Sequence, residues 1–588
     1  MTDVTSHAED PTSPTAVAPT AHQSSEVDRI AEEHFAEALA MSPVQLTDMG
    51  STERQDEYDD FSPAGHRAVD ELNRRTLARL AAATPTDVID KVTIAAMRER
   101  LGLEVETHQA GHHLLAVNNI ATPLHAIRAV YDQMPTDSAE DWQLVARRLR
   151  AVPVAIDGWW ASQQASVELG LAPARRQVDK LAEQVEQWAG PGGFLDVLAG
   201  QVPNGEKALP AGLVTELGEA VQVAREAFRG AVRRLRQELL PVSEERDGVG
   251  IERYRLASRR FLGARIDVAE TYRWGLAEVA RIRELEGQTV ERIRPGAGIA
   301  EAVALLDADE RYALHGTDAL QSWMQQTADR AVSDLTDVHF DIPEPMRRVE
   351  CCIAPTQDGG IYYTGPSEDF TRPGRMWWSV PEGVERFSAW RELTTVFHEG
   401  VPGHHLQVGQ TALRSELLNR WRRMGCWVSG HGEGWALYSE WLMADLGYLD
   451  DPGHLMGMLD AQMLRAVRVV IDIGLHCGVD GDEAFEAPEL VGGGVWDFEK
   501  AWRYFNHHVF MDEGFASFEV NRYAGWPGQA PSYKIGERLW LELRDEVRSA
   551  KLARGEQFSL KDFHRTALDQ GSLGLDVLRA AVLDICGV

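Results

Sequence analysis

Apolar side chains recur every three or four positions through most of the first 340 residues, which is the pattern of amphipathic helices. The segments that carry it are 26–40, 64–83, a helix that opens at 88, 141–151, 154–169, 174–189, 213–240, 258–286 and 299–335. Pro-Gly-Gly at 191–193 and Pro-Asn-Gly at 203–205 interrupt it as turns. We therefore expect residues 26–339 to form a helical lobe, and we take no catalytic residue from it.

The pattern changes near residue 340. Three short runs bounded by Gly and Pro, at 350–355, 360–365 and 375–380, predict the strands of a small sheet. Helical periodicity then returns at 390–397 and again at 463–477. We therefore predict that residues 340–588 form a second lobe. Its sheet either lines one rim of a cleft or closes a core as a β-hairpin.

Composition limits where the chain acts and what it binds. Residues 1–25 are mostly Thr, Ser, Pro and Ala and are expected to be a disordered tail. With 59 basic and 91 acidic side chains the net charge is −32, which gives no electrostatic reason to bind nucleic acid or an anionic membrane. Five cysteines without framework spacing, no signal peptide and no apolar run of membrane-spanning length favour the cytoplasm.

One stretch, Phe-His-Glu-Gly-Val-Pro-Gly-His-His-Leu-Gln at 397–407, concentrates the candidate chemistry. A His-Glu pair followed one turn later by a second His presents two imidazoles to zinc and a carboxylate to its water. Here the next histidines come six and seven residues after His398. On a straight helix His404 would lie about 9 Å further along the axis and about 120° away, so the two could not share a metal.

Pro402 offers a way around this spacing. It has no N–H for the carbonyl of His398, and Gly400 and Gly403 tolerate unusual dihedral angles. We therefore expect a π-type or looped widening over 400–402, which brings His404 to the place of the second ligand. His405 would then point elsewhere, in one interpretation toward the substrate.

Further candidates lie downstream on predicted helices. Glu433, in Gly-His-Gly-Glu-Gly-Trp at 430–435, could be a carboxylate ligand if its helix returns past the first, and glycines on both sides fit a close approach. Glu440, seven residues on, shares its face and could support the ligands. Asp472 and His476 are four apart and can pair, as a buried structural pair or behind the site.

The stretch 521–536 is rich in Gly and Pro, yet it carries two tyrosines and two cations, and we expect it to be a functional loop. Arg522 or Lys534 could hold the C-terminal carboxylate of a peptide. The alternative is that Arg522 pairs with Glu519 and that Tyr523 and Tyr533 only pack.

Together these segments resemble a bacterial family described as domain of unknown function 885. The matching stretches are HEGVPGHHLQ (398–407), EGWALYSE (433–440), the helix with Arg468, Asp472 and His476, and RYAGWPGQAPSYKIG (522–536). That family is similar to the mostly helical zinc peptidases, among them thimet oligopeptidase, neurolysin, angiotensin-converting enzyme and the Taq-type carboxypeptidases. The resemblance implies a mostly α, zincin-like fold of two helical lobes around a deep cleft, with a small antiparallel β-sheet at its edge.

Carried over to this chain, the resemblance implies one zinc ion held by His398, His404 and Glu433, with Glu399 as general base. The shorter spacing in those peptidases leaves the choice between His404 and His405 open. A downstream tyrosine, either Tyr533 or Tyr523, would lie near the reacting carbonyl.

The expected function is a zinc-dependent hydrolase, most simply a metallopeptidase acting on short peptides. A metal-dependent hydrolase of another amide or ester and an inactive helical binding protein are the alternatives. The intact Glu399 argues against the inactive protein, because a binding protein does not need that carboxylate. The substrate, the cleavage end and the oligomeric state are not predicted.

Overall fold

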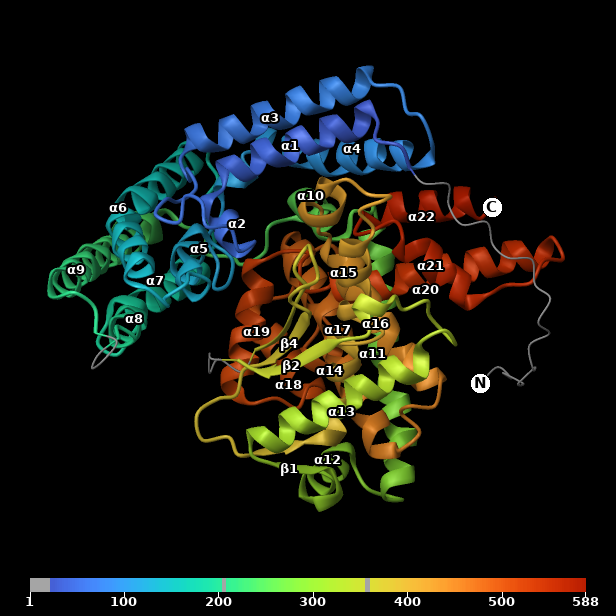
Figure 1. The fold of residues 1–588 in the computed structure, drawn as a ribbon. Helices are drawn as coiled ribbons and strands as arrows, with labels where there is room; N and C mark the ends of the chain where they lie inside the picture. The colour runs from blue at the N-terminus through green and yellow to red at the C-terminus, as the bar shows by residue number, and fades with distance from the viewer. Residues whose placement is uncertain (1–21, 204–207, 355–359) are drawn as a thin grey trace.

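The structure is a computed structural model that describes residues 22–203, 208–354 and 360–588, and helices dominate it (Figure 1). Some predictions fall on residues that the structure does not describe. These are positions 1–21 of the expected disordered tail, positions 204 and 205 of one predicted turn, and position 355 at the end of the first predicted strand. Ser25, the last residue of the expected tail, is ordered and caps the first helix.

Three helices at the N-terminal end lie side by side along one edge of the molecule (Figure 1). They are α1 (Glu26–Met41), α3 (Pro63–Ala82) and α4 (Val88–Gln109), with the short α2 (Pro43–Asp48) between the first two. Their first and last residues agree to within a few residues with the helices that the sequence predicts. Polar side chains cap α1, α3 and α4 at their N-termini, which fixes where each helix starts.

The next helices form an arm, which we define as α5–α9 and which projects from the main body (Figure 1). It comprises α5 (Pro123–Ala129), α6 (Ala139–Glu168), α7 (Arg175–Ala189), α8 (Phe194–Gly200) and α9 (Ala211–Arg234). The predicted helices 141–151 and 154–169 are one helix, α6, with Pro153 inside it. Burial of Val152 and Ile156 on either side of Pro153 holds that helix against α9 and offsets the lost hydrogen bond.

Two predicted helices are broken in the structure. Instead of 258–286 there are α10 (Ile251–Leu262) and α11 (Val268–Ile293), separated at Gly263, whose φ of 59° and close approach to Gly574 exclude a side chain. Instead of 299–335 there are α12 (Ile299–Ala308), the strand β1 (Ala313–His315) and α13 (Thr317–Leu335). The strand β1 pairs antiparallel with β5 (Arg386–Ser388).

The predicted sheet is present but it is mixed, and the expectation of an antiparallel sheet was wrong. Its strands are β2 (Val349–Ile353), β3 (Ile361–Thr364) and β4 (Gly374–Trp378), in the order β2-β4-β3. The strand β3 is antiparallel to β4, whereas β2 is parallel to it. The strand β3 runs opposite to both β2 and β4, so the chain reverses direction twice between β2 and β4. Because β4 lies in the middle of the sheet, β2 pairs with it and runs parallel to it.

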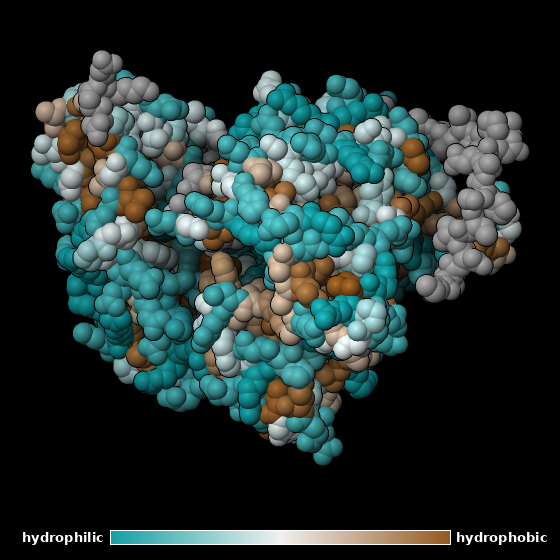
Figure 2. All heavy atoms as spheres, turned by 90° about the horizontal axis from the view of Figure 1, so that it is seen from below, coloured by the Kyte–Doolittle hydropathy of each residue, from teal (hydrophilic) through white to brown (hydrophobic). Residues whose placement is uncertain are grey.

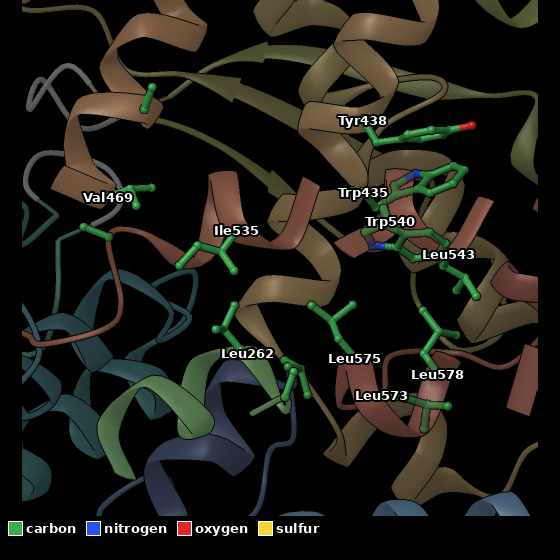
Figure 3. Close-up of a cluster of buried hydrophobic side chains, with 14 of the residues drawn as sticks. Leu262, Trp435, Tyr438, Val469, Ile535, Trp540, Leu543, Leu573, Leu575 and Leu578 are labelled. Atoms are coloured by element: carbon green, nitrogen blue, oxygen red, sulfur yellow. The ribbon is translucent and has the colours of Figure 1, made fainter. Parts of the chain in front are cut away.

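The remaining helices surround the motif segments. They are α14 (Ala389–Glu399), α15 (His404–Leu413), α16 (Ser429–Asp445), α17 (Pro452–Cys477), α18 (Phe498–His508), α19 (Glu513–Gly525), α20 (Ser532–Ala553), α21 (Leu560–Leu568) and α22 (Leu575–Ile585). The helices α16 and α20 pack backbone to backbone, because a Cβ on Gly434 would come within 2.4 Å of the Gly536 carbonyl carbon. Beside this contact, Trp435, Tyr438 and Trp540 form part of a buried cluster (Figure 3).

Packing joins segments from both sides of the predicted boundary at residue 340. The helix α11 lies along α17, and both contribute to one large buried cluster together with α1 and α4. A second cluster is confined to Val44 and the segment 117–239, which is the arm and its neighbourhood. The face shown in Figure 2 is hydrophilic over most of its area, and a furrow separates the arm from the rest. Among the described residues, no helix is long and apolar enough to cross a membrane.

Candidate metal centre

The helix α14 ends at Glu399, and α15 begins at His404 after a four-residue turn. Of the two widenings considered from the sequence, the looped one is present. The N–H of Gly403 donates to the Phe397 carbonyl, and a Cβ on Gly403 would lie 1.9 Å from the carbonyl oxygen of His398. Only glycine fits there, so the Gly-Val-Pro-Gly sequence is what allows the chain to fold back on the end of α14.

This turn brings His404 to His398. The two imidazole rings have centroids 4.9 Å apart and are almost perpendicular. Their Nε2 atoms both face the Oε2 atom of Glu433 on α16, at 3.4 Å from His398 and 3.6 Å from His404. Glu433 lies about one turn inside α16, which begins at Ser429, so its carboxylate is not at the first residue of the helix.

These separations fit a shared cation. Ligand atoms bound about 2.1 Å from a tetrahedral zinc ion lie roughly 3.4 Å from one another. The ligand atoms of His398, Glu399 and His404 also lie within 4.8 Å of one another, and all three residues are buried. Within the described chain, the two imidazoles therefore lie close to the carboxylate of Glu433 and also to that of Glu399, donors that could hold a divalent metal ion.

Charge in the site also favours a cation. Burial alone would lower the pKa of His398, but the carboxylates of Glu433 and Glu440 outweigh it and raise that pKa to about 10. Burial would raise the pKa of Glu433, yet the two histidines keep it well below its usual range. The carboxylates therefore create a negative potential at the histidine Nε2 atoms, where a metal ion would bind.

Glu399 differs from Glu433 in its surroundings. Burial raises its pKa above the ordinary value of 4.5, while His404 and His398 oppose that shift. It lies beside both histidines on the wall of the same cavity. A raised pKa makes this carboxylate a better proton acceptor than an ordinary glutamate, as a general base requires.

A hydrogen-bonded chain holds His398 from behind. Its Nδ1 lies 2.8 Å from the Oε1 of Glu440, and the other oxygen of Glu440 accepts from Thr394 (2.9 Å) and from Gln462 (3.2 Å). The Oε1 of Gln462 in turn accepts from Lys534 Nζ at 2.6 Å. With Nδ1 bound to a carboxylate, the free Nε2 of His398 is directed to the metal position.

A cavity of about 550 Å³ opens onto these groups. Its wall includes His398, Glu399, His404 and Glu433, together with Tyr363, Trp427, Arg465, Arg468 and Tyr533. Tyr533 contributes an aromatic hydroxyl, and burial followed by the charge of Glu433 raises the pKa of this tyrosine. The cavity therefore combines a possible metal position with carboxylates, phenol hydroxyls and two guanidinium groups.

His405 does not share the metal position. Its Nε2 lies 2.9 Å from the carbonyl oxygen of Met346, and its Nδ1 lies 2.9 Å from the hydroxyl of Tyr363. Burial lowers the pKa of His405 to about 4, so it is neutral and donates from Nε2. Of the two candidates for the second ligand, His404 is therefore the one that faces His398, while His405 connects α15 to the small sheet.

The expected functional loop at 521–536 is mostly helical. The helix α19 continues to Gly525 and α20 starts at Ser532, so the connection between them is short. Arg522 donates to Glu519 at 2.9 Å, which is the alternative considered from the sequence, and Tyr523 donates to the same carboxylate at 2.5 Å. Lys534 is fully buried between Gln462 and Glu537. Because Arg522, Tyr523 and Lys534 are bonded to these partners, they do not offer their polar groups to a substrate.

Asp472 and His476 contact the backbone of that same region. Asp472 accepts from the N–H of Gly528 at 3.0 Å, and the Nε2 of His476 donates to the carbonyl of Tyr523 at 2.8 Å. Burial raises the pKa of Asp472 to about 7 and lowers that of His476 to about 4, so His476 is neutral. The two residues fasten the α19–α20 connection to α17.

Several residues that surround the site have no role predicted from the sequence. Thr394 could have been found, since it precedes His398 by four residues and therefore shares its helix face. Arg465 and Gln462 lie on α17 beside the predicted Arg468. Trp427 precedes α16 and carries no motif, so only the three-dimensional arrangement places it on the cavity wall.

Comparison with known proteins agrees with this fold. A family described as "Bacterial protein of unknown function (DUF885)" matches residues 43–582. None of the curated proteins matches the chain. Among solved structures, a candidate lipoprotein from Colwellia psychrerythraea shares 22% identity, with a TM-score of 0.81 over 96% of this chain and 99% of that one.

Two further solved structures are similar at lower identity. A candidate lipoprotein of unknown function from Shewanella oneidensis shares 15% identity with a TM-score of 0.69, covering 95% of this chain and all of its own. A Pyrococcus furiosus carboxypeptidase shares 11% identity with a TM-score of 0.36, over 96% of this chain and 100% of that chain. The likenesses to the Colwellia and Shewanella proteins show a shared fold.

Proposed function

Because the chain belongs to the DUF885 family of bacterial proteins of unknown function, its activity has to be inferred from the site itself, and we propose that it is a zinc-dependent hydrolase of short peptides. The observation that carries this proposal is the convergence of His398 and His404 on one oxygen of Glu433, with Glu399 beside them on a cavity wall. Two imidazoles and one carboxylate are the protein ligands of a catalytic zinc that keeps a position open.

The residues of the chain then divide the work of amide hydrolysis. Glu399 accepts a proton from the attacking water and returns it to the leaving amine. A zinc ion held by His398, His404 and Glu433 would supply Lewis-acid activation. The hydroxyl of Tyr533, on the same wall, donates a hydrogen bond to the developing oxyanion. Tyr523 is the weaker candidate for that role, since its hydroxyl is bound to Glu519.

An arginine in the cavity that has no ion pair among the described residues favours a substrate with a carboxylate. The NH1 of Arg465 donates to the Ala461 carbonyl at 3.1 Å, and its Nε is buried without a hydrogen-bond partner. Within the described residues no carboxylate forms an ion pair with Arg465 at 4.0 Å or less, whereas Arg468 is paired with Glu519. Arg465 therefore replaces Arg522 and Lys534 as the proposed anchor for the C-terminal carboxylate of a peptide.

Location in the cytoplasm belongs to the same proposal. All five cysteines are free thiols, as expected in a reducing compartment. The Colwellia and Shewanella proteins are candidate lipoproteins, so fractionation of the native cells decides between the cytoplasm and the envelope for this chain.

A peptide-library digest read by mass spectrometry tests the function. The zinc-loaded protein should cleave short peptides, and the zinc-loaded Glu399→Gln variant should cleave them about 10²–10⁴ times more slowly, which is the contribution of a general base. Cleavage at the same rate by both proteins would assign the hydrolysis to another site or to a contaminant. Release of acids from esters or other amides, with peptides left intact, would identify a non-peptide hydrolase.

A further inference from the structure

A second cavity, of about 490 Å³, also has Glu433 in its wall. Its volume lies within the range of small-molecule sites. Five aromatic side chains line it, contributed by α1, α10, the turn 421–425 and the segments that flank α16 and α19: Phe35, Phe261, Trp421, Trp427 and Trp526. Phe261 and Trp526 meet edge to face, with ring centroids 5.4 Å apart. We call this space the aromatic cavity.

The charged groups around the aromatic cavity have partners of their own. Arg100 is bonded to Glu99 and to the backbone carbonyls of α10, and Arg260 lies 3.6 Å from Glu104. Burial lowers the pKa of His34 to about 4, so this residue is neutral, and its Nδ1 contacts Thr76 at 3.0 Å. With these charges paired, the aromatic rings offer a surface for an apolar group, beside the polar side chains of Gln45, Ser429 and Gln529.

Trp427 and Glu433 belong to the walls of both cavities. The indole of Trp427 lies near the metal position, with its ring centroid 6.2 Å from that of His404. It is 53% exposed, which is more than is usual for a tryptophan. A Cβ on Gly432 would come within 2.3 Å of the indole, so the glycine before Glu433 leaves room for this ring.

We infer that the aromatic cavity binds a bulky apolar side chain of the peptide substrate, on the N-terminal side of the bond that is cleaved. This inference rests on the proposed peptidase function and adds the substrate class. Since both cavities share Glu433 and Trp427 in their walls, one extended peptide can occupy both and place its scissile bond at the histidines on the wall of the first cavity. With the C-terminal carboxylate at Arg465, the preceding residues run toward the aromatic cavity.

The test uses tetrapeptides of alanine with a free C-terminus, in which phenylalanine occupies each position in turn. Phenylalanine on the N-terminal side of the cleaved bond should raise kcat/KM on the order of 100-fold over alanine, the discrimination that an apolar pocket supplies. Ala38→Trp fills the aromatic cavity from α1 and should remove this preference. Ala36→Trp, at an exposed position of the same helix, is the matched control and should keep it.

Binding without turnover separates this inference from the proposed function. N-acetyl-L-phenylalaninamide should bind the wild type in calorimetry, N-acetylglycinamide should not, and both Ala38→Trp and Phe261→Ala should weaken the first ligand. Binding of N-acetyl-L-phenylalaninamide with no cleavage of any peptide would support the aromatic cavity as a binding site and would rule out the peptidase function. Cleavage without preference for phenylalanine, and with equal kcat/KM in Ala38→Trp, would overturn the aromatic cavity and leave the peptidase.

Discussion

Glu440 lies directly behind His398, with its Oε1 atom 2.8 Å from the histidine Nδ1. Both side chains are buried, and the second oxygen of Glu440 is held by Thr394 and Gln462. The arrangement fixes both the rotation of the imidazole and the nitrogen that carries its proton. It is the kind of support that metal-binding histidines receive in proteins.

Replacing Glu440 with glutamine should therefore weaken metal binding while the fold is retained. Loss of the carboxylate behind a metal-binding histidine typically lowers affinity 10–100-fold. The measurement is the zinc dissociation constant from competition with a chelator. Glu416→Gln, on the exposed segment after α15, is the control. Equal affinities in Glu440→Gln and the wild type would show that His398 does not depend on this support.

The two adjacent histidines should behave differently on substitution. His404→Ala removes a group that faces Glu433 and should abolish stoichiometric zinc binding. His405→Gln should keep one zinc per chain, because His405 contacts Met346 and Tyr363 instead. It should lower the unfolding temperature, since a buried pair of hydrogen bonds is disturbed. Retention of zinc by His404→Ala, with loss from His405→Gln, would reverse the ligand assignment.

Removal of the guanidinium at position 465 should change how the protein responds to the C-terminus of its substrate. In the wild type, amidation of a cleaved peptide should raise KM roughly tenfold or more, because a charge-assisted bond to a carboxylate is lost. In Arg465→Ala, the acid and the amide should have similar KM values. Arg273→Ala, an exposed cation on α11, is the control. Undiminished discrimination in Arg465→Ala would exclude it as the anchor.

Asp472 should make the folded state less stable as the pH rises. Burial raises its pKa from the ordinary 3.8 to about 7, so between these values the folded chain holds a proton that the unfolded chain has released. Stability contributed by this proton is therefore present at low pH and lost as the pH rises toward 7. Asp472→Asn has no such proton, so its stability relative to the wild type should increase from pH 5 to pH 8.

Urea unfolding at the two pH values measures this change, which we expect to be roughly 1–4 kcal/mol from a shift of about three pH units. Asp584→Asn, at an exposed position of α22, should show no such change. A constant difference between Asp472→Asn and the wild type across this range would mean that Asp472 is ionised in the folded protein at both pH values.

Local pattern was sufficient for most helices and for the first part of the site. Helical periodicity located α1, α3 and α4, and the unusual residues around Pro402 predicted that His404 folds back on His398. Both follow from the properties of neighbouring residues. The direction of β2 could not be obtained in this way, since it depends on two chain reversals and on which strand lies in the middle of the sheet.

The residues proposed to bind the substrate could not be predicted from the sequence, for a physical reason. Gly and Pro around Trp526 suggested a loop with free cations, yet Arg522 and Lys534 lie on helices whose packing gives them buried acidic partners. Arg465 has no signature in the sequence, because the lack of a carboxylate partner among the described residues depends on what the fold brings near it. Trp427 likewise gains its place between two cavities from helices that are distant in the sequence.

We propose that one zinc ion at His398, His404 and Glu433 makes this chain a peptidase. The most direct test is a titration of chelator-treated protein with zinc, in which the metal per chain and the cleavage rate of a peptide identified in the library are measured on the same samples. The rate should rise in proportion to bound zinc, saturate at one ion per chain, and stay at background in Glu433→Ala. Full activity in the chelator-treated protein, or an equal rise in Glu433→Ala, would contradict the account.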